Sequence, residues 1–115
     1  SVLLLGRGST SINTGGEKVF PEEVESTLKG NPKVYDTVVV GVPDERFGQA
    51  ITAVVQLRPG EQLDYLDMKE FCRGNIASYK IPRHLVICDQ IKRSPAGKAD
   101  YPWTKQFALD ALGMS

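Results

Sequence analysis

Apolar residues along this chain form two patterns, short continuous runs and runs with helical spacing. Residues 38–42 and 51–57 are apolar and rich in β-branched side chains, a composition typical of buried strands. Residues 85–88 predict a further strand. Turn-forming residues at 43–44 and 58–60 follow the two long runs, so we expect those two strands to be joined by a turn.

The first part of the chain predicts a short hairpin between residues 2–5 and 12–13, with the turn at Gly8. Gly6 and Gly8 follow a strand-like run, but the third glycine of a dinucleotide-binding fingerprint is missing and Gly15-Gly16 does not begin a helix. The sequence also contains no phosphate-binding glycine loop of the Walker type. We therefore expect no nucleotide-binding loop of either kind in this chain.

A helix is predicted to begin at Pro21, because proline suits the first helical position. Its end is expected at residues 30–32, where Gly-Asn-Pro interrupts the pattern. Glu23 and Glu25 fall in the opening turns, where the helix dipole favours acids. We expect both carboxylates to stabilise the start of the helix and not to take part in chemistry.

Two more helices are predicted from apolar stripes, and we interpret both stripes as core. The first stripe consists of Leu63, Leu66, Met68, Phe71, Cys72 and Ile76. The second helix begins at residues 100–102, and its apolar face consists of Trp103, Phe107, Ala111 and Leu112. Together with the strands, these helices predict one small α+β domain, with a mixed β-sheet and helices packed on it.

The composition argues against several classes of function. The chain has 14 basic and 14 acidic residues, so its formal net charge is zero and no basic stripe indicates nucleic acid. No run of about 18 apolar residues indicates a transmembrane segment. Cys72 and Cys88 lack metal-binding or redox spacing and are expected to be buried free thiols in a reducing compartment. With His84 as the single histidine, we expect no metal site and no catalytic thiol.

Four segments carry a family resemblance. They are residues 6–25 (GRGSTSINTGGEKVFPEEVE), 41–49 (GVPDERFGQ), 79–83 (YKIPR) and 93–98 (RSPAGK). In their order and spacing they resemble the carboxy-terminal region of the adenylate-forming enzymes, which include acyl- and aryl-CoA synthetases, carrier-protein adenylation domains and luciferases. The resemblance covers nearly the whole chain.

The resemblance implies a domain division and a set of substrates. Residues 1–8 would end a large amino-terminal domain and form the joint, and residues 9–115 would be the mobile C-terminal domain. The missing domain would bind ATP with its Mg²⁺ and hold the acyl pocket, and CoA would be the thiol substrate. The segments look most like actinobacterial enzymes acting on fatty or sterol side-chain acids. We expect a cytoplasmic protein and leave peripheral membrane association open.

Lys98 is the candidate catalytic residue. Pro95 and Gly97 predict a tight turn that holds this lysine away from the body of the domain. The family places a lysine here that bridges the α-phosphate and the attacking carboxylate, where negative charge moves during adenylation. A solvated lysine after a turn is the competing interpretation.

The resemblance also implies a rotation of the small domain about a hinge. Ser9 aligns with the hinge residue, where the family usually has Asp or Lys, and the neighbouring Gly8 could supply the torsional freedom. Arg7 matches an arginine that contacts the nucleotide near the joint. Lys18 matches a position that contacts nucleotide phosphate or lines the thiol tunnel, and a solvated role competes for it.

After the rotation, Gly15, Gly16 and Glu17 would line the tunnel for the pantetheine of CoA, because glycine allows close approach to the backbone. An ordinary turn is the alternative for the two glycines. Lys80 and Arg83 flank Pro82 and are candidates for the phosphates of the CoA nucleotide.

Two other functions remain open from the sequence. The chain could belong to an adenylation enzyme that loads a carrier protein, although residues 103–115 look like a terminating helix. A non-catalytic, stand-alone α+β binding module would be favoured if the native gene began near Ser1. In the leading interpretation the isolated domain is inactive.

Overall fold

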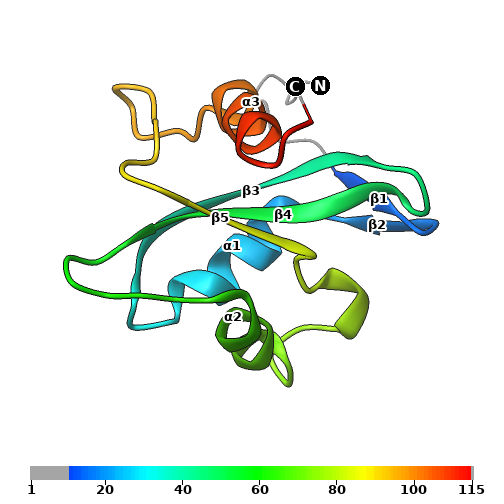
Figure 1. Ribbon diagram of the computed structural model, residues 1–115, viewed down its shortest axis with the longest axis horizontal. Coiled ribbons are helices and arrows are strands. Elements are labelled where there is room, and N and C mark those ends of the chain that lie inside the picture. The colour runs from blue at the N-terminus through cyan, green and yellow to red at the C-terminus, as the bar shows by residue number, and fades with distance from the viewer. Residues whose placement is uncertain (1–10, 115) are drawn as a thin grey trace.

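The computed structural model describes residues 11–114 and shows a sheet with helices on both of its faces (Figure 1). The order is β1 (Ile12–Thr14), β2 (Glu17–Val19), α1 (Pro21–Lys29), β3 (Val34–Asp44), β4 (Gly48–Leu57), α2 (Tyr65–Cys72), a 3₁₀ turn (Ser78–Lys80), β5 (His84–Cys88) and α3 (Tyr101–Ala111). The predicted α+β class is confirmed.

The sheet is mixed, as predicted. Its strands follow the order β2-β1-β4-β3 with antiparallel pairing, and β5 pairs with β4 in parallel. The long β3–β4 ribbon is the centre of the sheet, with its register running from Val34↔Leu57 to Asp44↔Gly48. β1 reaches β4 only at Thr14↔Gly48, and β5 pairs with residues 52–56 further along the same edge.

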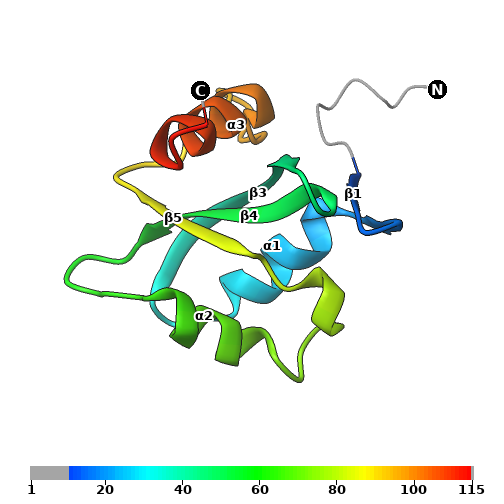
Figure 2. The same cartoon turned by 45° about the vertical axis from the view of Figure 1, so that its right-hand side comes forward.

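Two apolar cores lie on opposite faces of the β3–β4 ribbon. Val39, Ile51 and Val55 face α1 and α2, and Val38, Val40 and Val54 face α3. Figure 2 shows the same three layers, with α3 on one side of the sheet and α1 and α2 on the other. Burial on both faces explains why these strands read as continuous apolar runs in the sequence and not as an alternating pattern.

β3 is longer than the apolar run that predicted it. It begins four residues earlier, at Val34, because Asp36 and Thr37 are polar residues whose hydrogen bonds are satisfied inside the fold. Its end is also later than expected, because Pro43 still pairs with Gln49 and the turn follows Asp44. The expected hairpin about Gly8 lies partly outside the described residues. The hairpin that the structure describes joins β1 to β2.

The helices begin close to the predicted positions, but two residues assigned to the core are exposed. Leu66 is 72% exposed, although it was placed in the stripe of α2. Ala111 is also exposed, because the buried face of α3 runs through Thr104 and Ala108. Trp103 is partly exposed and stacks on Phe107, with ring centroids 5.3 Å apart.

None of the helices in residues 11–114 is long and apolar enough to cross a membrane.

Glu25 differs most from its expected role. It was expected only to stabilise the start of α1, but its side chain is buried, and its Oε2 accepts hydrogen bonds from the Val39 amide at 3.0 Å and the Tyr101 hydroxyl at 2.9 Å. One carboxylate therefore joins α1, β3 and the first turn of α3. Burial raises the pKa of Glu25, and the two hydrogen bonds counteract only part of that effect.

Both cysteines are buried and free, as predicted. Burial raises the pKa of the Cys72 thiol, and it raises the pKa of Cys88 to about 11. Since the thiolate is the nucleophilic form, neither side chain has the low pKa of a reactive cysteine.

The raised pKa of Glu25 predicts a stability difference that depends on pH. The folded wild type holds the Glu25 proton more tightly than the unfolded chain does, so this carboxyl lowers stability as the pH rises from below 4.5 through its raised folded pKa. Glu25→Gln stays neutral, so its stability relative to wild type should increase across that window, in urea unfolding at a series of pH values.

Tyr101→Phe provides the comparison, because it removes a hydrogen bond that lowers the pKa of Glu25. The loss of stability should then extend to higher pH than in wild type. A difference between Glu25→Gln and wild type that stays constant with pH would contradict this role of burial.

Candidate functional site

Lys98 ends a tight loop between β5 and α3. The Gly97 amide donates to the Ser94 carbonyl at 2.8 Å, the Ser94 amide donates to the Lys98 carbonyl at 2.8 Å, and Gly97 has φ of 86°. This is the pattern of a three-residue hairpin loop with a glycine in the left-handed region. Lys98 is exposed, and its ammonium makes no hydrogen bond or ion pair with residues 11–114. The predicted turn is confirmed.

Arg93 fixes this loop to the sheet. Its guanidinium forms two hydrogen bonds to the Asp36 carboxylate, Nη2–Oδ1 at 2.7 Å and Nε–Oδ2 at 2.8 Å, and its Nη1 donates to the Gly97 carbonyl at 3.1 Å. Such two-point pairing is geometrically specific. The residue next to Lys98 is therefore held by a side chain that is anchored on β3.

The charges of this pair favour each other's ionised form. Burial acts to raise the pKa of Asp36, but the hydrogen bonds and positive charge of Arg93, together with the Thr37 amide and Lys29, outweigh burial and lower it. The pKa of Arg93 is raised, mainly by its hydrogen bonds to Asp36. The anchor is therefore ionised at neutral pH.

Gly15 and Gly16 form the two-residue turn of the β1–β2 hairpin. Their φ values are 58° and 86°, and Thr14 pairs with Glu17 across the turn. Positive φ at both central positions is characteristic of a tight hairpin turn that favours glycine. The ordinary-turn interpretation thus accounts for both glycines. A role for Gly15, Gly16 and Glu17 in a CoA tunnel stays a prediction.

The cations predicted to bind nucleotide and CoA have different surroundings. Lys18 lies exposed on β2, paired across the hairpin with Asn13. Lys80 Nζ contacts both oxygens of Glu23 at 2.8 and 2.9 Å, which raises the pKa of Lys80. Arg83 instead lies over the Phe47 ring, with its guanidinium carbon 3.8 Å from the centroid.

The β3–β4 turn brings Arg83 close to the glycine turn. The Gly15 amide donates to the Phe47 carbonyl at 2.9 Å, and a Cβ at Gly15 would lie 3.3 Å from the Phe47 ring. Asp44 accepts hydrogen bonds from the Arg46 and Phe47 amides, while the Arg46 side chain also lies over Phe47. Backbone hydrogen bonds to Asp44 and ring contacts with Phe47 hold this turn in place.

The structure therefore separates the candidate residues into two groups. In Figure 1 the loop that ends at Lys98 lies at the left end of the molecule, and the β1–β2 and β3–β4 turns lie at the right end. Gly15 and Arg83 meet through Phe47, whereas Lys98 lies far from both along the longest dimension of 40 Å. Arg7 and Ser9 lie outside the described residues.

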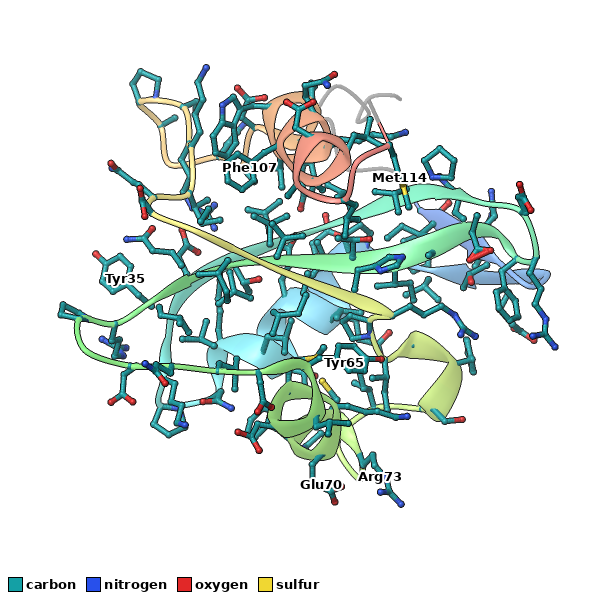
Figure 3. All side chains as sticks on the ribbon, viewed as in Figure 1. Tyr35, Tyr65, Glu70, Arg73, Phe107 and Met114 are labelled. Carbon is teal, nitrogen blue, oxygen red and sulfur yellow. The ribbon has the colours of Figure 1, made fainter. Side chains whose placement is uncertain are left out.

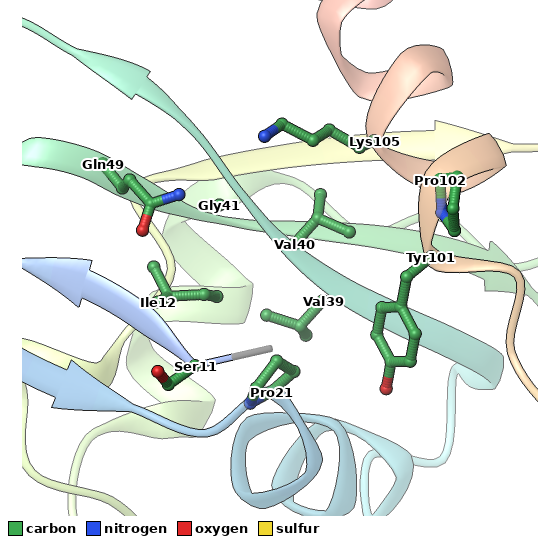
Figure 4. A pocket seen from close by; sticks show the side chains of 10 residues that line it. All are labelled: Ser11, Ile12, Pro21, Val39, Val40, Gly41, Gln49, Tyr101, Pro102 and Lys105. Atoms are coloured by element: carbon green, nitrogen blue, oxygen red, sulfur yellow. The ribbon is translucent and has the colours of Figure 1, made fainter. Parts of the chain in front are cut away.

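A pocket of about 290 Å³ opens between β1, the start of α1, β3 and α3 (Figure 4). Val39, Val40 and Gly41 line it from β3, with Tyr101 and Lys105 from α3. Neither candidate group lies in this pocket. Among residues 11–114, no cluster of three or more histidine, cysteine or acidic side chains is arranged to hold a metal ion.

Comparison with known families identifies the fold. The family model described as "AMP-binding enzyme C-terminal domain" matches residues 23–98, more than half of the chain. The chain belongs to this family. The match ends at Lys98, the last residue of the loop described above.

Individual proteins also resemble this AMP-binding enzyme C-terminal domain over most of its length. A Mycobacterium tuberculosis protein named "Medium/long-chain-fatty-acid--CoA/3-oxocholest-4-en-26-oate--CoA ligase" is 58% identical over 92% of this chain and 19% of its own length. The "3-oxocholest-4-en-26-oate--CoA ligase" of Rhodococcus rhodochrous is 59% identical over 91% of this chain and 19% of its own. The chain thus spans about a fifth of these relatives.

A solved structure has the same fold. The crystal structure of apo MatB from Rhodopseudomonas palustris superimposes with a TM-score of 0.83 and 33% identity, covering 92% of this chain and 21% of that one. This chain and the matched fifth of that structure therefore share one architecture.

Sequence reasoning missed the side chains that position these groups. Asp36 and Arg93 are 57 residues apart, and neither stands in a pattern that indicates pairing. For Phe47 the sequence does contain one indication of a contact, because it is a large aromatic residue in an otherwise polar turn. Its contact with Arg83 joins segments far apart in the chain, so local sequence could not predict it.

Removing the Asp36 carboxylate should destabilise the domain. Asp36→Ala leaves Arg93 partly buried without its acceptor, and we expect a loss of roughly 1–3 kcal/mol in the free energy of unfolding near neutral pH. The difference should shrink below pH 3.8, because the lowered pKa of Asp36 makes its contribution disappear as the carboxylate is protonated. Urea unfolding measures both.

Lys29→Ala is the matched control. Lys29 also lies near Asp36, at 3.5 Å, but it is 45% exposed, so its removal should cost less than about 1 kcal/mol. Equal losses from both variants would contradict a special role for the Arg93–Asp36 pair.

Proposed function

We propose that this domain is the mobile C-terminal part of an ATP-dependent fatty acyl-CoA synthetase. The observation that carries the proposal is the Lys98 loop, which presents an unpaired ammonium from a turn anchored on the sheet. The 58% identity to a fatty-acid and oxocholestenoate CoA ligase supports the same reaction class. The remainder of the enzyme, an amino-terminal domain, would bind ATP and the acid.

Lys98 would act in the first half-reaction. A carboxylate oxygen of the acid forms a bond to the α-phosphorus of ATP, while the bond to the pyrophosphate oxygen breaks. Negative charge is shared by the attacking carboxylate and the phosphate oxygens during this step. A lysine between them stabilises that charge and orients the two reactants. The rigid loop reduces the reorganisation that this placement requires.

The glycine hairpin would act in the second half-reaction. The thiol of CoA loses its proton, its sulfur bonds to the acyl carbon, and AMP leaves with the electrons of the broken bond. Lys98 and the hairpin lie at opposite ends of the domain (Figure 1). One rigid body can then present each end in turn, with Ser9 as the proposed hinge and Arg7 and Lys18 near the nucleotide.

The class of acid substrate is proposed from the names of the relatives. Their names specify medium- and long-chain fatty acids and a sterol side-chain acid, and we propose acids of this class for the parent enzyme. Mg²⁺ would accompany ATP at the amino-terminal domain. We propose a cytoplasmic enzyme and favour CoA over a carrier protein as acceptor, since the matched relatives are named CoA ligases.

Two half-reactions measured on the full-length protein test the role of Lys98. With Lys98→Ala, acid-dependent exchange of pyrophosphate into ATP should fall by about 10²–10³, because a contact made to the transition state is lost. Thioester formation from preformed acyl-adenylate and CoA should stay near the wild-type rate.

Lys92→Ala is the matched control at the base of the same loop. Lys92 is exposed and lies 3.8 Å from Asp100, so its removal should leave both half-reactions nearly unchanged. If Lys98→Ala leaves pyrophosphate exchange intact, Lys98 is a surface charge and the assignment is wrong.

A further inference from the structure

The peptide unit that joins Gly97 to Lys98 is hydrogen-bonded at both of its polar ends. Its carbonyl oxygen, on Gly97, accepts from Arg93 Nη1 at 3.1 Å, and its amide, on Lys98, donates to Ser94 Oγ at 3.2 Å. A peptide unit is planar, so fixing its oxygen and its N–H together fixes the orientation of the plane. The direction in which the Lys98 side chain leaves the loop depends on that orientation.

The loop has little else to keep this peptide unit in place. Gly97 has φ of 86° and no Cβ, so the peptide unit beside it can turn over more easily than it could beside another residue. The stem of the loop is a single antiparallel bridge between Arg93 and Ala99, and so short a hairpin is not stable by itself. The shape of the loop must therefore come from contacts with the rest of the domain.

Arg93 makes that contact with the sheet. Its Nε and Nη2 bind the Asp36 carboxylate on β3, while Nη1 of the same guanidinium binds the Gly97 carbonyl. The guanidinium is planar and rigid, so the position of Asp36 determines where the Gly97 carbonyl can lie. The group lines a hollow that Tyr35 also lines, at the end of the molecule where Figure 3 labels Tyr35.

We propose that Arg93 is a positioning residue for adenylation, which acts through Lys98 by holding the peptide unit before it in one orientation. Arg93 itself contacts no reacting group, because its charge is paired with Asp36. The two hydrogen bonds to the peptide unit give the Lys98 ammonium one direction of approach to the transferring phosphate. This inference rests on the proposed function and adds the residue that directs the catalytic lysine.

The two half-reactions of the full-length protein test this role. In Arg93→Gln, acid-dependent pyrophosphate exchange should fall by roughly 10- to 100-fold, the effect expected when a catalytic group is misplaced by about 1 Å. The loss should appear in kcat with KM for ATP close to wild type, because the lost alignment matters in the transition state. Thioester formation from preformed acyl-adenylate and CoA should stay near the wild-type rate, which also shows that the variant is folded.

Arg93→Lys separates the geometry of the guanidinium from its charge. Lysine can keep an ion pair with Asp36, but its ammonium lacks the planar fork that also reaches the Gly97 carbonyl. Stability in urea should therefore recover more than pyrophosphate exchange does. Exchange at the wild-type rate in Arg93→Lys would mean that the charge alone is sufficient, and would overturn the proposal.

A double variant shows whether Arg93 acts through Lys98. Arg93→Gln combined with Lys98→Ala should exchange pyrophosphate no more slowly than Lys98→Ala alone, because no ammonium is left to direct. A further loss as large as that of Arg93→Gln in the wild-type background would mean that Arg93 acts on the substrates independently, which contradicts a positioning role.

Arg73→Gln is the matched control. Arg73 forms an ion pair with Glu70 at 3.1 Å, but both side chains are exposed and the pair lies on α2 and its end, where Figure 3 labels both residues. Its removal should leave both half-reactions unchanged.

Two results with Arg93→Gln would overturn the proposal: unchanged pyrophosphate exchange, or an equal loss in both half-reactions. Failure of the proposed function is distinguishable, because Lys98→Ala would then itself leave pyrophosphate exchange intact.

Discussion

The antiparallel pairing of β3 with β4 is the constraint on which the rest of the domain depends. This ribbon is buried on both faces, so it needs helices on each side, and α1 with α2 and α3 supply them. Asp36, near the start of β3, anchors Arg93 and the Lys98 loop. Phe47, just beyond its end, supports the glycine turn and Arg83. Asp44 lies eight residue steps beyond Asp36 along β3, roughly 26 Å at strand rise.

That separation bears directly on mechanism. A loop at one end and a hairpin at the other, both attached to one stiff ribbon, cannot occupy the same small active site at the same time. The proposed rotation of the whole domain would present the two ends to that site in turn. Rotation also needs only one flexible joint, because each end is already held in shape by its own contacts with the sheet.

The sequence predicted the class of fold, the helix starts and the Lys98 turn, because these depend on local signals such as Pro21, Pro95 and Gly97. It did not predict the roles of Asp36 and Glu25. Asp36 carried no prediction, Glu25 was expected only to stabilise the start of α1, and their partners Arg93 and Tyr101 are 57 and 76 residues away. Periodicity placed Leu66 and Ala111 in the core because a stripe says which residues share a face, not how wide the buried part of that face is. The contact of Arg46 and Arg83 with Phe47 was not predicted either, because Arg83 is distant in the chain from the other two residues.

The charged groups of the domain then fall into two kinds with different consequences. Arg93, Lys80 and Lys92 have carboxylate partners inside the fold, and among them the partly buried Arg93 anchors the Lys98 loop. Lys98, Arg46 and Arg83 have no such partner among the described residues, and they stand at the two ends of the ribbon. The whole chain has zero formal net charge, so the acids that could have paired with these cations are present but lie elsewhere. An unpaired cation held by a rigid turn or ring loses little on meeting a phosphate, because no internal ion pair has to break first. In the proposed function, the unpaired cations at the two ends of the ribbon would therefore be available to an anionic substrate.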